Sequence, residues 1–171
     1  MLRTWLWGPF SPLGLGIAAL TVLADQAHKA WMLYAYDIGA KGTVALTPFF
    51  DLVLVWNYGI SYGLLQQESA LGRLGLIGFA LGASLALTVW LARLTSPLAA
   101  GSIGLIIGGA LGNVIDRVAY GAVADFFSLN AFGYQWYVFN VADAAIVAGV
   151  AGLLYDSLLG GHKKAGNPSK M

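Results

Sequence analysis

Four long apolar segments constrain this chain more than any other feature. They cover about residues 12–35, 71–93, 98–118 and 138–159, and each is close to the ~20 residues that a helix needs to cross the hydrocarbon of a bilayer. Only 10% of the residues are charged, whereas soluble domains average about a quarter. The sequence therefore predicts an all-α membrane protein with four transmembrane helices, and excludes a water-soluble globule.

The first apolar segment could be confused with a secretory signal, because Arg3 precedes an apolar run that ends near Ala24. The run continues past Asp25 through residues 30–33, however, and no small-x-small cleavage site closes it. We therefore expect this segment to remain as a transmembrane helix.

The distribution of Lys and Arg predicts the orientation, since basic residues favour the cytoplasmic side. With four crossings, one side carries Arg3, Arg93, Lys163, Lys164 and Lys170, and the other carries Lys41 and Arg73. Both termini are then cytoplasmic. Residues 1–160 form a single membrane domain, segments of about 36–70 and 119–137 lie outside the cytoplasm, and residues 161–171 form a flexible cytoplasmic tail.

The first outer segment is predicted to contain a small β element. Residues 43–47 and 52–56 are rich in β-branched and apolar residues and are separated by Pro48, so they are typical of two short strands. A sheet there would form a wall for a site at the membrane surface. Several aromatic side chains are expected at the interface, where such rings concentrate: Trp56, Tyr58, Tyr62, Trp136 and Tyr137.

Composition also limits the chemistry. The chain has no cysteine, which excludes disulfides, thiolate metal sites and a cysteine nucleophile. Its longest basic run is Lys163-Lys164, so no nucleic-acid partner is expected. Without paired histidines or an acidic loop, no metal and no cofactor are expected.

Four acidic residues lie in apolar surroundings, where a carboxylate is costly and needs a reason to be present. Asp25, Asp116, Asp125 and Asp143 all fall toward the outer end of the predicted bundle. Two carboxylates without a metal favour an aspartyl pair that shares one proton and activates water. The residues alone leave Asp116 as a rival to Asp125 for this role.

Each acid also has a structural interpretation. Asn140 is a good N-cap, so Asp143 could help to begin the last helix. Asp25 and Lys29 have the spacing of an ion pair on one helix face. Asn113 and Arg117 share another face, and the glycines at 108, 109 and 112 favour close helix packing.

Five motifs in order resemble the lipoprotein signal peptidases, which are membrane aspartyl peptidases. They span about residues 15–159: Asp25-Gln26-x-x-Lys29; Asn57-x-Gly59 with Gly63; Gly108-Gly109-x-x-Gly112-Asn113-x-x-Asp116-Arg117; Val123-x-Asp125-Phe126; and Phe139-Asn140-x-Ala142-Asp143. Two positions differ from the residues that are common in the family, and both are expected at the rim or in the packing of the site. Ser61-Tyr62 replaces the common Ala-Phe, and Ala144 replaces a common Ser.

The resemblance implies an endopeptidase that cuts diacylglyceryl-modified prolipoproteins on the amino side of the lipidated cysteine. It implies Asp125 and Asp143 as the catalytic pair. It further implies a surface cradle over residues 43–57 and a short covering helix near 58–70.

The resemblance assigns the remaining motif residues to substrate contact or site support: Asn57, Gly59, Arg117, Asn113, Asn140, Asp116, Asp25 and Lys29. The expected partners are the lipid-modified precursor and membrane lipids, with the chain as a monomer in the bacterial inner membrane. A small proton-coupled transporter and a non-catalytic lipopeptide-binding adaptor are the alternative functions.

Overall fold

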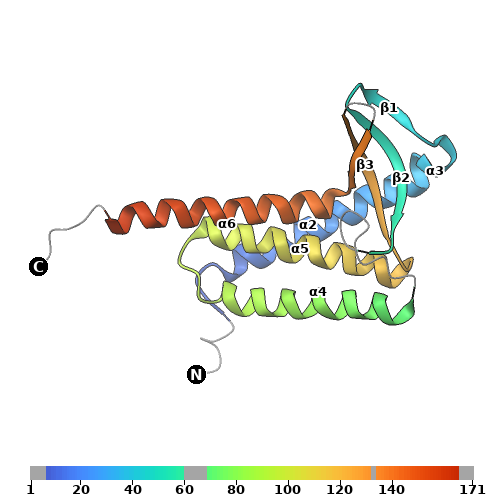
Figure 1. The fold of residues 1–171 in the computed structure, drawn as a ribbon. Helices are drawn as coiled ribbons and strands as arrows, with labels where there is room; N and C mark the ends of the chain where they lie inside the picture. Colours follow the sequence, from blue (N-terminus) through green and yellow to red (C-terminus); the bar gives the residue numbers. More distant parts are fainter. Residues whose placement is uncertain (1–6, 60–68, 132–133, 166–171) are drawn as a thin grey trace, which may run out of the picture.

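Four long helices lie side by side in the computed structural model, and a sheet lies across one end of them (Figure 1). The structure describes residues 7–59, 69–131 and 134–165. The helices are α2 (Ser11–Ala30), α4 (Ala70–Leu91), α5 (Pro97–Ala119) and α6 (Val141–Ala165). The start of α2 and the end of α6 both lie at the end of the bundle that is opposite the sheet (Figure 1).

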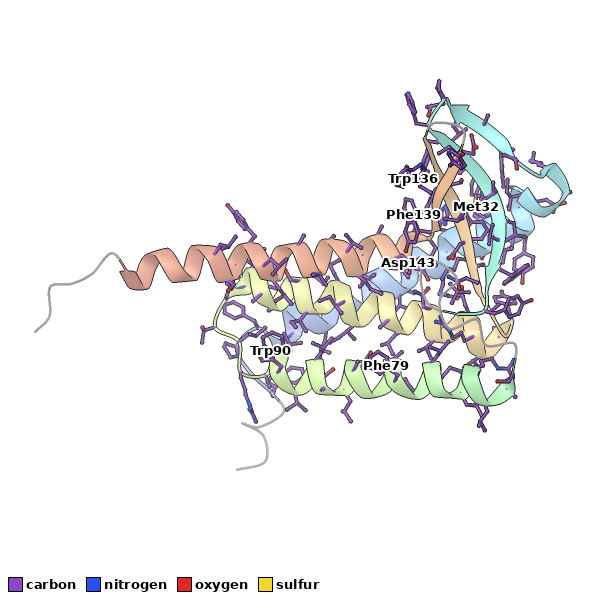
Figure 2. All side chains as sticks on the ribbon, in the orientation of Figure 1. Met32, Phe79, Trp90, Trp136, Phe139 and Asp143 are labelled. Carbon is purple, nitrogen blue, oxygen red and sulfur yellow. The ribbon has the colours of Figure 1, made fainter. Side chains whose placement is uncertain are left out.

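Three of the helices in the described part of the chain are long and apolar enough to cross a membrane: α4, α5 and residues Val141–Leu158 of α6. They correspond to the second, third and fourth predicted spans. Only 11% of the apolar window in α4 is buried, and its outward side chains are apolar, as Phe79 illustrates (Figure 2). The first predicted span corresponds to α2, which is not among these three helices.

Helix α2 ends differently from the expected continuous span to residue 35. A π-helical turn, η1 (Trp31–Ala35), follows it, and the short helix α3 (Ile38–Lys41) comes next. Asp37 between them has a φ of 52°, in the left-handed region that Asp tolerates better than most residues. This turn redirects the chain from the bundle into the sheet.

The sheet has four antiparallel strands in the order β1-β2-β3-β4. Strands β1 (Val44–Thr47) and β2 (Phe50–Asn57) confirm the two predicted strands. Strands β3 (Val123–Ala131) and β4 (Tyr134–Phe139) come from the second outer segment, for which no strand was predicted. The sheet is therefore built from both outer segments. Strand β2 pairs directly with β3, although α4 and α5 lie between them in the sequence.

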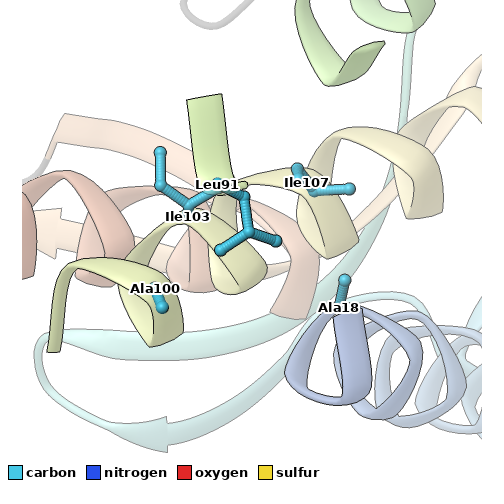
Figure 3. Packing of buried hydrophobic residues seen from close by; sticks show 5 residues of the cluster. All are labelled: Ala18, Leu91, Ala100, Ile103 and Ile107. Atoms are coloured by element: carbon cyan, nitrogen blue, oxygen red, sulfur yellow. The ribbon is translucent and has the colours of Figure 1, made fainter. Parts of the chain in front are cut away.

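Helix α5 is central, because it packs against α2, α4 and α6. A buried apolar cluster joins α2, α4 and α5 (Figure 3): Ala18, Leu91, Ala100, Ile103 and Ile107. A second cluster seats the sheet on η1 and α3, which follow α2: Met32, Ile38, Ala124 and Phe126. Together these clusters fix the sheet over one end of the bundle.

The glycines of α5 confirm the predicted close packing. A Cβ on Gly108 would lie 2.5 Å from the Cβ of Thr21 and 2.6 Å from the carbonyl oxygen of Ala18. A Cβ on Gly112 would lie 2.6 Å from Oδ2 of Asp25. The chain thus needs glycine here to bring α2 and α5 together beneath the sheet.

The last helix is longer than expected. Helix α6 continues to Ala165, past the predicted domain boundary at residue 160. The covering helix expected near 58–70, with Ser61 and Tyr62, falls mostly outside the described residues, as do residues 166–171 of the tail.

Candidate active site

The candidate site forms where the sheet meets the bundle, and Asn140 lies at this junction. Strand β4 ends at Phe139 and α6 begins at Val141, so Asn140 is the one residue between them. Its Oδ1 accepts a hydrogen bond from the backbone N–H of Asp143 (2.9 Å), and its own N–H donates to Oδ2 of Asp143 (3.3 Å). This reciprocal pair confirms Asn140 as the N-cap of α6.

Asp125 lies on β3 and is 1% exposed. Its Oδ1 accepts a hydrogen bond from Nδ2 of Asn140 (2.6 Å), and its Oδ2 accepts one from Nδ2 of Asn57 (3.2 Å). Asn57 pairs with Val123 in the β2–β3 register, so Asn57 and Asp125 are diagonal neighbours on one face of the sheet. The strand pairing therefore brings together two predicted site residues that are far apart in sequence.

Asp143 lies in the first turn of α6 and is half-buried. Its Oδ1 accepts a hydrogen bond from Nδ2 of Asn113 on α5 (2.9 Å). Nδ2 of Asn140 also donates to Oδ1 of Asn113 (3.2 Å). The side chain of Asn140 thus touches Asp125, Asn113 and the backbone of Asp143, so one buried amide links Asp125 to the helix turn that carries Asp143.

The surroundings of Asp125 favour its protonated form. Burial, first, and the nearby charge of Asp143, second, raise the pKa of Asp125 to about 7. The hydrogen bonds from Asn140 and Asn57 and the charge of Lys29 act in the opposite direction. A carboxyl group with this pKa can hold a proton near neutral pH, which an ordinary aspartate does not.

A cavity of about 160 Å³ opens beside this pair. Seven residues line it: Asn57, Gly59, Asn113, Arg117, Val123, Asp143 and Ile146. All except Val123 and Ile146 were predicted as site residues. The guanidinium of Arg117 crosses the cavity wall, with Nη2 donating to the carbonyl of Gly59 (2.7 Å) and Nη1 to the carbonyl of Asn113 (3.2 Å).

Asp25, Lys29 and Asp116 form a buried group next to this cavity. Lys29 Nζ lies 2.8 Å from Oδ2 of Asp25, which confirms the predicted pair, and 2.8 Å from Oδ2 of Asp116. The cation paired with Asp116 is therefore Lys29 and not its neighbour in sequence, Arg117. Consecutive residues point to different faces of a helix, and Arg117 is directed into the cavity wall.

Gln26 was part of a predicted motif but had no predicted role. Its Nε2 donates to Oδ2 of Asp25 (3.1 Å), the carbonyl of Gly112 (3.2 Å) and Oδ1 of Asp116 (3.0 Å). Its position beside Asp25 in the motif is the signal that could have identified it. Within the described ranges, no group of three or more His, Cys, Asp or Glu could hold a metal ion.

Fold and site together define a multi-pass membrane protein in which two carboxylates, those of Asp125 and Asp143, accept hydrogen bonds from asparagine amides at the end of the helix bundle. Residues 17–159 match the family described as Signal peptidase (SPase) II. The chain therefore belongs to the signal peptidase II family and is an aspartic peptidase of a bacterial membrane. This membership selects the peptidase over the transporter and the adaptor.

Similar proteins include lipoprotein signal peptidases. The chain is 55% identical over 155 residues to a lipoprotein signal peptidase of Nitrobacter hamburgensis, covering 87% of this chain and 94% of the relative. It is 57% identical over 146 residues to one of a Methylobacterium species, covering 85% and 88%. A solved structure described as a bacterial membrane enzyme, at 2.3 Å resolution, is 27% identical, with a TM-score of 0.74 and coverage of 94% of each chain.

Proposed function

We propose that this chain removes the signal peptide from prolipoproteins, with Asp125 and Asp143 as its catalytic pair. The observation that carries the assignment is the buried amide of Asn140, which contacts Asp125 directly and caps the helix turn that holds Asp143. Asp116 is the weaker candidate, because its carboxylate is paired with Lys29 and accepts the N–H of Ala124, whereas Asp125 bonds to Asn57, which lines the cavity.

The two carboxyl groups then have different roles in the reaction. Asp143 at the α6 N-terminus is the ionised base, because the helix dipole and the N–H of Asn140 stabilise its charge. It takes a proton from water as the water oxygen attacks the peptide carbonyl carbon, and Asp125 gives its proton to the carbonyl oxygen. When the intermediate collapses, the C–N bond breaks, Asp143 protonates the leaving amine, and the hydroxyl proton returns to Asp125.

Substrate contacts are assigned to the cavity wall. Arg117 and Asn57 carry donors that suit peptide carbonyl groups, and the backbone of Gly59 lies beside them. Nε of Arg117 is buried without a hydrogen-bond partner within the described residues. The scissile bond lies on the amino side of the diacylglyceryl-modified cysteine, whose lipid stays in the bilayer.

Helix α2 serves as the fourth span. Its 20 residues correspond to a length of about 30 Å, enough for the hydrocarbon core. Leu20 and Leu23 expose 67% and 64% of their surface, which suits contact with lipid. The domain of residues 1–160 then has its sheet and outer segments 36–70 and 119–137 on the periplasmic side, both termini in the cytoplasm, and works as a monomer in the inner membrane.

Cleavage of a defined precursor tests this function. The purified chain is incubated with a diacylglyceryl-modified precursor and, separately, with the same precursor lacking the lipid. We expect mass spectrometry to find a product that begins with the lipidated cysteine, and only from the modified precursor. Equal cleavage of both precursors, or a cut at another bond, would refute the proposed substrate.

A further inference from the structure

We propose that Lys29 is a positioning residue that fixes Asp125 and Asp143 relative to each other through two buried carboxylates. The proposal rests on the assignment of Asp125 and Asp143 as the catalytic pair. It concerns how the pair is held in place, and Lys29 itself is not among the residues that line the cavity.

Each of the two carboxylates anchors the backbone immediately before one member of the pair. Oδ1 of Asp25 accepts a hydrogen bond from the N–H of Ala142 (2.9 Å), the residue before Asp143. Oδ2 of Asp116 accepts one from the N–H of Ala124 (3.0 Å), the residue before Asp125. The two catalytic segments, one a helix start and the other a strand, are therefore held by the same kind of contact.

Lys29 connects these two anchors. Its Nζ lies 2.8 Å from a carboxylate oxygen of Asp25 and 2.8 Å from one of Asp116. Asp25 and Lys29 come from α2, and Asp116 comes from α5. One ammonium group thus fixes the separation of the two carboxylates that hold α6 and β3.

Lys29 also orients an amide of the site. Its Nζ lies 3.4 Å from Oδ1 of Asn113, and an ammonium group can only donate. The oxygen of Asn113 therefore faces Lys29, and its NH₂ group faces Asp143, where it donates to Oδ1 (2.9 Å). Removing the ammonium would leave only Asn140 to keep this amide in the required orientation.

The charges of the group explain why lysine is needed. Asp25 and Asp116 are each 0% exposed and Lys29 is 2% exposed, so one ammonium compensates two buried carboxylates. Gln26 adds donors to both carboxylates but no charge. Without Lys29 the two carboxylates would repel each other and lose the cation that holds them together.

The test compares Lys29→Met with a control at the far end of the bundle. Oγ of Ser96 donates to Oδ1 of Asp156 (2.5 Å), an interhelical contact remote from the cavity. We expect Lys29→Met to lower kcat about 100-fold, as small displacements of reacting groups do, with KM changed less than about threefold. Asp156→Asn is expected to lower the melting temperature while kcat stays within about twofold.

A second variant separates positioning from folding. Lys29→Met combined with Asp116→Asn keeps the single excess negative charge of the native group, so it relieves the repulsion that could unfold Lys29→Met. We expect the double variant to melt closer to the native temperature and to keep the low kcat. Native kcat in either folded variant would overturn the positioning role. Asp125→Asn is assayed beside them: cleavage by Asp125→Asn would refute the catalytic pair instead.

Discussion

At the scale of single residues, the site depends on asparagine amides that can donate and accept at once. Asn140 uses its oxygen for the backbone of Asp143 and its NH₂ group for Asp125 and Asn113. No residue without both functions could make these contacts. The asparagine therefore serves the helix start and the carboxyl pair together.

Asn140→Ala is expected to remove both the N-cap of α6 and the hydrogen bond to Asp125. Removal of an N-cap and of buried hydrogen bonds should lower the free energy of unfolding by about 2–4 kcal/mol, and cleavage should fall far more than this loss of stability explains. Asn130→Ala is the matched control, because Asn130 bonds to Asp51 and Ser128 elsewhere on the sheet. Similar cleavage by the two folded variants would contradict the role of Asn140.

The pKa of Asp125 predicts the pH dependence of cleavage. Because this pKa is raised to about 7, Asp125 keeps its proton below that pH and loses it above. We expect kcat to fall as pH rises through about 7, approaching tenfold per pH unit. Melting curves over the same range serve as the control for folding, and a kcat that stays constant to pH 9 would contradict Asp125 as the proton donor.

The raised pKa of Asp125 also makes the stability of the protein depend on pH. The folded state binds the proton of Asp125 more tightly than the unfolded chain, so its contribution is fully present at low pH and is lost as pH rises through about 7. Asp125→Asn removes this titration. We therefore expect the melting temperature of the variant, relative to the native protein, to be higher at pH 8 than at pH 5. A difference that does not change with pH would refute the assigned titration.

The sequence could predict which polar residues form the site, because each lies in a motif or carries a charge in an apolar segment. It could not predict which partner each one takes. Lys29 was paired with Asp25 from their spacing on one helix, but its second partner, Asp116, lies on another helix. Contacts of this kind depend on how α2 and α5 pack, which helical spacing does not contain.

At the scale of elements, α5 determines the site because its glycines let two other helices approach closely. Gly108→Ala should lower the free energy of unfolding by about 1–3 kcal/mol, since the new Cβ would meet Thr21 and Ala18. Gly78→Ala on α4 is the control. Nothing lies within 4 Å of its Cβ position, so higher helix propensity should stabilise it slightly. Equal effects of the two substitutions would show that packing at Gly108 is unimportant.

Strand β3 shows why part of the sheet escaped prediction. A half-buried strand alternates buried and exposed residues, but the first four residues of β3, residues 123–126, are all at most 2% exposed. This first part of the strand is covered on both faces, so it carries no period of two. Strands β1 and β2 were predictable because β-branched residues and a proline mark their limits.

At the scale of the whole molecule, the sheet lies over one end of the helix bundle (Figure 1), and the predicted site residues contact one another where the sheet meets α2, α5 and α6. The spans and this common end could be predicted from hydropathy and charge. The cavity could not, because residues of β2, β3, α5 and α6 line it together, and local sequence patterns do not contain how these elements pack.

Cysteine labelling tests the proposed orientation. The chain has no native cysteine, so each variant carries a single labelling site. Leu46 on β1 is 52% exposed, and Thr95 between α4 and α5 is exposed at the opposite end. A membrane-impermeant thiol reagent added to the outside of the inner membrane should label Leu46→Cys, and should label Thr95→Cys only after permeabilisation. The reverse pattern would show that the sheet faces the cytoplasm.

The most direct test of the catalytic pair is the rate of precursor cleavage by Asp125→Asn and Asp143→Asn, each first shown to be folded by its melting curve. We expect both variants to lose cleavage by at least about 1,000-fold, whereas Asp51→Asn, a substitution on the sheet outside the cavity, keeps nearly native activity. Near-native cleavage by either of the two site variants would contradict a mechanism in which Asp125 and Asp143 share the proton transfers.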